Sequence, residues 1–84
     1  MIYRRLYDTS PHLFKPGEYG KWEGEFYLRS PKGLLANLGN HTIVEHDDFS
    51  ITVRPSILVS DRVDSDHGYF TRGEWTYDPP AELL

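Results

Sequence analysis

The fold is decided by residues 50–73, which read SITVRPSILVSDRVDSDHGYFTRG. From Ser50 to Ser60 apolar and other side chains alternate, which is the period-two pattern of a strand with one buried face. Pro55 interrupts this run, and because proline has no N–H to donate to a ladder, it marks an edge, a bulge or a bend. The run is therefore either one bulged strand or two strands that meet at residue 55.

The second half of this stretch predicts a hairpin. Residues 67–72 and 74–77 flank Arg72-Gly73, and Gly73 can take the positive φ that a two-residue turn requires. Residues 61–66 (DRVDSD) lie between the two parts, and we expect them to form an exposed acidic loop.

Outside this stretch the chain predicts more short strands, at 2–7, 21–29 and 41–46, with a turn at 30–33. Residues 33–38 suit either a strand or a single helical turn, because periodicity does not separate the two in so short an apolar run. Residues 8–20 carry two prolines and two glycines and predict an exposed loop. Within it, Leu13 and Phe14 are expected to contact the core.

Together these elements predict an all-β fold, either a small antiparallel sandwich or an open barrel of six or seven short strands. The 84 residues form one domain, 1–84, in which 79–84 is a C-terminal tail.

Composition excludes several kinds of function. The chain has no cysteine, which removes disulfides, thiolate zinc sites and a cysteine nucleophile. Its N-terminus lacks the apolar run of a signal peptide, and no segment approaches the roughly 20 apolar residues of a membrane span. We expect a cytoplasmic protein with no membrane contact and no cofactor. A small domain without covalent cross-links often depends on a partner or forms a homo-oligomer.

Charge is unevenly distributed along the sequence. Residues 1–44 hold six basic and four acidic groups, a net charge of +2, whereas residues 45–84 hold three basic and nine acidic groups, a net charge of −6. The acidic half argues against nucleic acid as a ligand, because phosphate binding needs a basic face. It is either an ordinary solvated surface or a patch that binds a basic surface on another protein.

Ser56 and His67 are the candidate catalytic residues. A serine becomes a nucleophile when a base takes its proton and a third group orients that base. The alternative is that the Ser56 hydroxyl satisfies the backbone around Pro55 and that His67 is a partly buried strand residue. No nucleophile-elbow motif is present to decide between them.

The four histidines (His12, His41, His46 and His67) match no metal-ligand spacing, so no metal site is predicted. Exposed aromatic residues beside acidic groups would suit a protein-binding face, because Tyr and Trp often anchor interfaces. The candidates for such a face are Asp61, Asp64, Asp66, Tyr69, Trp75 and Tyr77.

The motif in residues 51–75 resembles a family of small phage-encoded proteins of unknown function. Its members share a Thr/Ser-x-x-Pro-Ser-Ile strand, a Cys-His or Trp-His step into a His-x-aromatic strand, and a glycine turn. Related domains occur in bacterial ubiquitin-like conjugation operons, where a peptidase role has been proposed. The resemblance extends over residues 33–77 and implies a phage or prophage origin, with Ser56 and His67 as functional candidates. The chain departs from the family at Ser30–Gly33 and Asp66, where many members carry cysteines.

Two functions remain open at this point. The first is a phage accessory protein that binds a host protein, with inhibition of that protein as one outcome. The alternative is a peptidase or amidase that uses Ser56 and His67. A structural role in the virion and mimicry of DNA are further options, although a net charge of −4 is modest for a DNA mimic.

Overall fold

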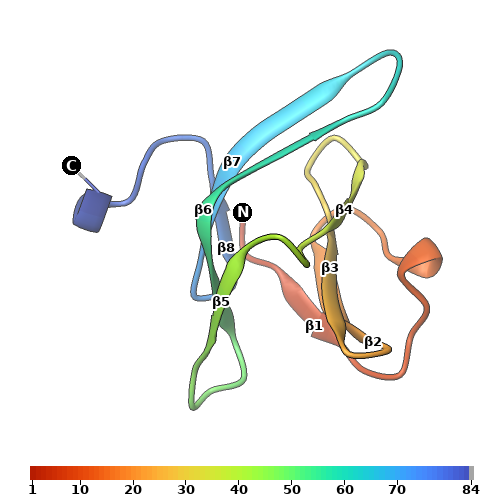
Figure 1. Ribbon diagram of the computed structural model, residues 1–84, viewed down its shortest axis with the longest axis horizontal. Helices are drawn as coiled ribbons and strands as arrows, with labels where there is room; N and C mark the ends of the chain where they lie inside the picture. The colour runs from red at the N-terminus through yellow and green to blue at the C-terminus, as the bar shows by residue number, and fades with distance from the viewer. Residues whose placement is uncertain (84) are drawn as a thin grey trace.

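Residues 1–83 are described by a computed structural model, in which two four-stranded β-sheets face each other (Figure 1). The first sheet has the order β1-β2-β3-β4, with strands β1 (Arg4–Leu6), β2 (Glu18–Trp22), β3 (Glu25–Arg29) and β4 (Leu35–Asn37). The second has the order β5-β6-β7-β8, with strands β5 (Thr42–Glu45), β6 (Ile51–Ser60), β7 (Ser65–Thr71) and β8 (Glu74–Thr76). Two 3-10 turns, η1 (Pro11–Leu13) and η2 (Ala81–Leu83), complete the described elements. The all-β prediction is confirmed, with eight strands rather than the expected six or seven.

The N-terminal residues connect the two sheets. Ile2 forms a bridge with Glu74, and the Trp75 N–H donates to Met1 O at 2.9 Å, so residues 1–3 lie along the β8 edge of the second sheet. The chain then enters β1, which pairs in parallel with β2 of the first sheet. This is the one parallel pair among the described strands, and the other strand pairs are antiparallel.

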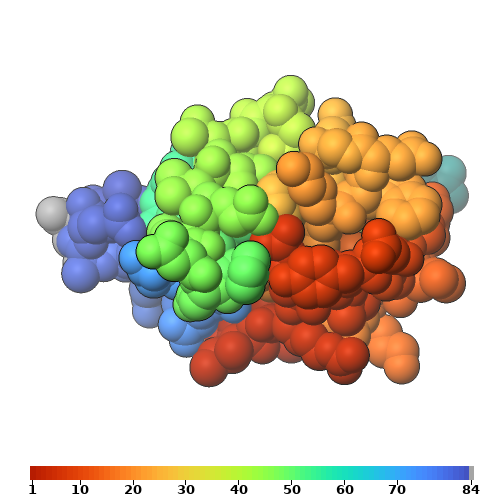
Figure 2. Space-filling model, turned by 90° about the horizontal axis from the view of Figure 1, so that it is seen from below, coloured from red at the N-terminus to blue at the C-terminus, as the bar shows by residue number. Residues whose placement is uncertain are grey.

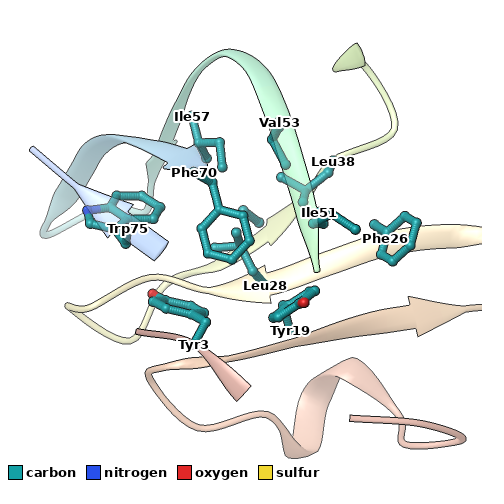
Figure 3. Packing of buried hydrophobic residues seen from close by; sticks show 11 residues of the cluster. Tyr3, Tyr19, Phe26, Leu28, Leu38, Ile51, Val53, Ile57, Phe70 and Trp75 are labelled. Carbon is teal, nitrogen blue, oxygen red and sulfur yellow. The ribbon is translucent and has the colours of Figure 1, made fainter. Parts of the chain in front are cut away.

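The core lies between the sheets and is rich in aromatic residues (Figure 3). The Phe70 ring is buried and meets the Tyr3 and Tyr19 rings edge-on, at centroid distances of 5.0 and 5.2 Å. Trp75 stacks on Tyr3 at 6.4 Å. Burial of apolar area contributes about 25 cal/mol per Å², so these few large rings supply much of the stability of so short a chain.

Strand β6 is one continuous strand with a bulge at Pro55, and not two strands that meet there. Val53 pairs with Phe70 and Ile57 pairs with Gly68. Between these pairs β6 advances four residues while β7 advances two, so β6 carries two extra residues in the bulge. Pro55 lies there and is exposed, where its missing N–H costs no ladder bond.

The hairpin predicted around Arg72-Gly73 is confirmed. Arg72 has φ 46° and Gly73 has φ 77°, and they join β7 to β8 as a two-residue turn. Both values lie in the left-handed region that such turns use.

The single strand predicted over 21–29 is wrong. Glu23 (φ 50°) and Gly24 (φ 86°) form a two-residue turn, and Lys21↔Phe26 and Trp22↔Glu25 pair across it. The segment therefore holds the end of β2, a two-residue turn and all of β3.

The exposed loop predicted over 8–20 is wrong in part. Phe14 is 4% exposed and reaches the interior as expected, but Leu13 is 70% exposed. Tyr19 and Gly20 are buried members of β2. Residues 33–38 include a strand, β4, and not a helical turn.

Candidate functional site

Ser56 and His67 lie side by side on the outer face of the second sheet. The Ser56 Oγ is 2.8 Å from His67 Nε2, which is the distance that a nucleophile and its general base require. Ser56 is half-buried and His67 is exposed. The two residues come from neighbouring strands, because His67 on β7 pairs with Leu58 on β6.

Ser56 lies in the bulge of β6, between the pairs formed by Val53 and Ile57. The Ser56 carbonyl lies 3.1 Å from His41 Nε2, which fixes the backbone of the bulge from the side of β5. A cleft of about 470 Å³ opens beside Ser56, between the sheet and the C-terminal segment. Its lining residues are Thr42, Arg54, Pro55, Ser56, Tyr69, Glu82 and Leu83.

The Ser56–His67 pair has two of the three parts of a catalytic triad. In residues 1–83 no carboxylate forms a hydrogen bond with His67, so nothing described holds its ring in one tautomer. An exposed Ser–His contact across two strands is also an ordinary way to stabilise a sheet. The geometry therefore permits serine chemistry without supplying the group that orients the base.

Asp66 does not lie on an exposed loop, so its predicted place is wrong. It is a β7 residue that is 3% exposed, and its carboxylate accepts hydrogen bonds from Lys32 N at 3.0 Å and Tyr77 Oη at 2.9 Å. Burial opposes ionisation, but hydrogen bonds from Lys32, Ser30 and Tyr77 hold the pKa of Asp66 below its usual range. Asp66 thus joins β7 to the β3–β4 turn of the other sheet.

Trp75 also lies away from the surface. Its side chain is 1% exposed and belongs to the core. Of the other residues predicted for a binding face, Tyr77 is 57% exposed, Tyr69 is half-buried in the wall of the cleft, and Asp61 and Asp64 are exposed.

Asp61 and Asp64 belong to a projection that we call the hairpin tip, residues 58–65. In Figure 1 the β6–β7 hairpin extends beyond the rest of the fold. The Asp61 carboxylate accepts hydrogen bonds from the N–H groups of Val63 and Asp64, both at 2.8 Å, and these bonds lower the pKa of Asp61. Lys32 pairs with Asp64 at 3.3 Å.

The sequence analysis missed two apolar residues on the hairpin tip. Val63 is 95% exposed and Leu58 is 68% exposed. The only signal in the sequence was an isolated valine among the charged and polar residues 61–66. Such a valine is not informative until the orientation of its side chain is known.

Three of the four histidines make separate polar contacts. His46 Nε2 lies 2.6 Å from Thr52 Oγ1, whereas His41 and His67 contact different atoms of Ser56. Across residues 1–83 no three His, Asp or Glu side chains converge as metal ligands would. The same residues include no helix with the length and apolar character needed to cross a bilayer.

Comparison with known proteins finds no matching family model, no matching curated protein and no matching solved structure. The relation to small phage-encoded proteins thus stays a prediction from the motif.

Proposed function

We propose that this chain is a protein-binding module and that the hairpin tip is its contact surface. The observation that carries the proposal is Val63, which is 95% exposed at the end of a tip whose backbone is fixed by Asp61. An apolar side chain on an ordered backbone loses little conformational entropy when a partner covers it. Nothing in residues 1–83 uses Val63 to stabilise the fold, because its side chain faces solvent.

The proposed partner is a protein with an apolar pocket and basic groups at its rim. Arg62 and Asp64 directly flank Val63, with Asp61 one position further, and the C-terminal half of the chain has a net charge of −6 from nine acidic and three basic groups. Complementary charges of this kind speed association and select the partner. With the phage resemblance, the partner we propose is a bacterial host protein met in the host cytoplasm, whose activity the module inhibits.

A capture experiment with matched variants tests this proposal. Tagged wild type, Val63→Ser and Val44→Ser are each used to capture proteins from a bacterial host lysate. Val44 is the control because it is also an exposed valine, at 51%, but lies on β5. We expect one stoichiometric protein with wild type and Val44→Ser, lost with Val63→Ser and weakened as salt rises. Equal capture by both variants would place the contact elsewhere.

A Ser/His-dependent hydrolase is the second candidate, and the 2.8 Å contact between Ser56 Oγ and His67 Nε2 favours it. Turnover of p-nitrophenyl acetate and of a mixed peptide library would be measured for wild type, Ser56→Ala and His67→Ala. Removal of a true nucleophile or base lowers the rate by at least about 100-fold. Ser60→Ala is the control, since Ser60 is an exposed serine on the same strand. Rates that do not differ between Ser56→Ala and Ser60→Ala would exclude this chemistry.

A further inference from the structure

Arg54 is held rigidly in the wall of the cleft. Its guanidinium donates to Val53 O at 2.8 Å, Phe70 O at 3.1 Å and Thr71 Oγ1 at 2.8 Å. The side chain is 20% exposed, so one edge of the guanidinium still faces the cleft. A guanidinium fixed in this way is a prepared site for a carboxylate, because its donors need no further ordering.

The chain's own tail already uses this site. Glu82 Oε1 lies 2.6 Å from Arg54 Nη2, and the Glu82 side chain is 58% exposed. Within residues 1–83 this is the one hydrogen bond that joins η2 to the sheet, since Leu83 N–H donates locally to Pro80 O. Figure 2 shows the C-terminal segment in blue-violet as a projection at one end of the molecule, consistent with so few contacts.

We propose that Arg54 in the wall of the cleft is a binding site for the carboxylate of an acidic peptide segment, and that Glu82 is its internal ligand. Arg54 binds the carboxylate, while Thr42, Ser56 and Tyr69 line the same cleft. The site is separate from the hairpin tip, so the proposal does not depend on the proposed function.

The occupant follows from the segment that is bound now. Residues 78–83 read DPPAEL, and the two prolines restrict the backbone, so little entropy is lost when such a segment docks. An ion pair with one largely exposed partner contributes little, so a segment of similar sequence on another protein can replace the tail. The partner's segment is therefore acidic and contains proline, and its carboxylate lies in a short 3-10 turn as that of Glu82 does.

A peptide titration tests the site. The probe is an N-acetylated, C-terminally amidated peptide of sequence DPPAEL, added to wild type, Glu82→Ala and Glu74→Ala and followed by NMR shifts of Thr42 and Tyr69. Without Glu82 the internal ligand loses its anchor, so we expect Glu82→Ala to bind the probe about fivefold more tightly than wild type. Glu74→Ala removes an exposed carboxylate on β8 and should bind as wild type does.

Two further arms complete the test. Arg54→Gln should weaken binding, but it also removes hydrogen bonds within the sheet. A probe with Gln in place of Glu tests the same contact without changing the protein. It should bind to Glu82→Ala about fivefold more weakly than the Glu probe does. Equal binding of the two probes, or equal affinity of wild type and Glu82→Ala, would overturn the proposal.

Discussion

The indole of Trp75 lies across Gly68 so closely that a Cβ on Gly68 would overlap Cε2, Nε1 and Cζ2 of the ring. Gly68 is buried on β7, and Trp75 on β8 is 1% exposed. The missing side chain of Gly68 is what makes room for the largest side chain of the core. This relationship gives the first of four predictions.

Gly68→Ala should destabilise the protein by about 1–3 kcal/mol, because the added methyl group forces the indole or the strand to move. Urea unfolding followed by tryptophan fluorescence measures the change in the free energy of unfolding. In a Trp75→Leu background the same substitution should cost less, since the ring it meets is gone. An equal cost in both backgrounds would show that strand geometry, and not the indole, requires glycine. Gly39→Ala is a control, because the nearest atom to its added Cβ is in the flexible Asn37 side chain.

Asp66 should make stability depend on acid pH. Burial opposes the ionised form, but its hydrogen bonds lower the pKa of Asp66 in the folded state, so the stabilisation is complete above the unfolded pKa of about 3.9. It is lost as pH falls through the lower folded pKa. We expect the free energy of unfolding to decrease below about pH 4, and to decrease less steeply in Asp66→Asn.

At neutral pH Asp66→Asn should also be less stable than wild type by about 2 kcal/mol, because hydrogen bonds to a buried charge are replaced by weaker ones. Asp78→Asn removes an exposed carboxylate and serves as the control. If the free energy of unfolding of both variants falls with pH as that of wild type does, the hydrogen bonds between Asp66 and the β3–β4 turn do not control acid unfolding.

Glu23→Asn should raise stability by about 0.5–1 kcal/mol. Glu23 has φ 50° in the β2–β3 turn, and asparagine adopts this left-handed conformation at lower cost, especially before a glycine. Thermal unfolding gives the comparison, with Glu74→Asn as a charge-matched control in extended backbone. A gain that appears in both variants would come from charge and not from the turn.

Asp61→Ala should loosen the hairpin tip without unfolding the domain. Its carboxylate accepts the N–H groups of Val63 and Asp64, so hydrogen exchange at these two amides should accelerate while core amides such as that of Phe70 stay protected. If the hairpin tip binds a partner as proposed, the same variant should bind more weakly, since its order is lost. Unchanged exchange at residues 63 and 64 would show that the turn is rigid without Asp61.

Local signals made β6 and the β7–β8 turn predictable, but they misplaced Ser65 and Asp66 in a loop. The alternation in β6 and the Arg72-Gly73 turn each act over a few residues, so the sequence alone specifies them, whereas Pro55 left one bulged strand and two strands as alternatives. The two-residue turn at Glu23-Gly24 was missed because the alternation continues across it without a break. A turn with Asn at position 23 would have given the stronger signal.

Contacts between distant residues could not be predicted. Asp66 looks like one more loop carboxylate in the sequence, and its burial depends on Lys32 and Tyr77, which lie 34 and 11 residues away. The parallel pairing of β1 with β2 is equally non-local. For Ser56 and His67 the sequence placed the two on adjacent strands, but their 2.8 Å contact depends on the register of β6 with β7, which shifts at the bulge.

Residues 1–3, which connect the two sheets, affect the order in which the chain folds during synthesis. The Met1 carbonyl accepts its hydrogen bond from Trp75, and Tyr3 N–H donates to Gly73. These residues therefore stay without their partners until residues 73–75 have left the ribosome. Contacts of such long range slow folding, so residues 1–3 can join the two sheets only after β8 has emerged.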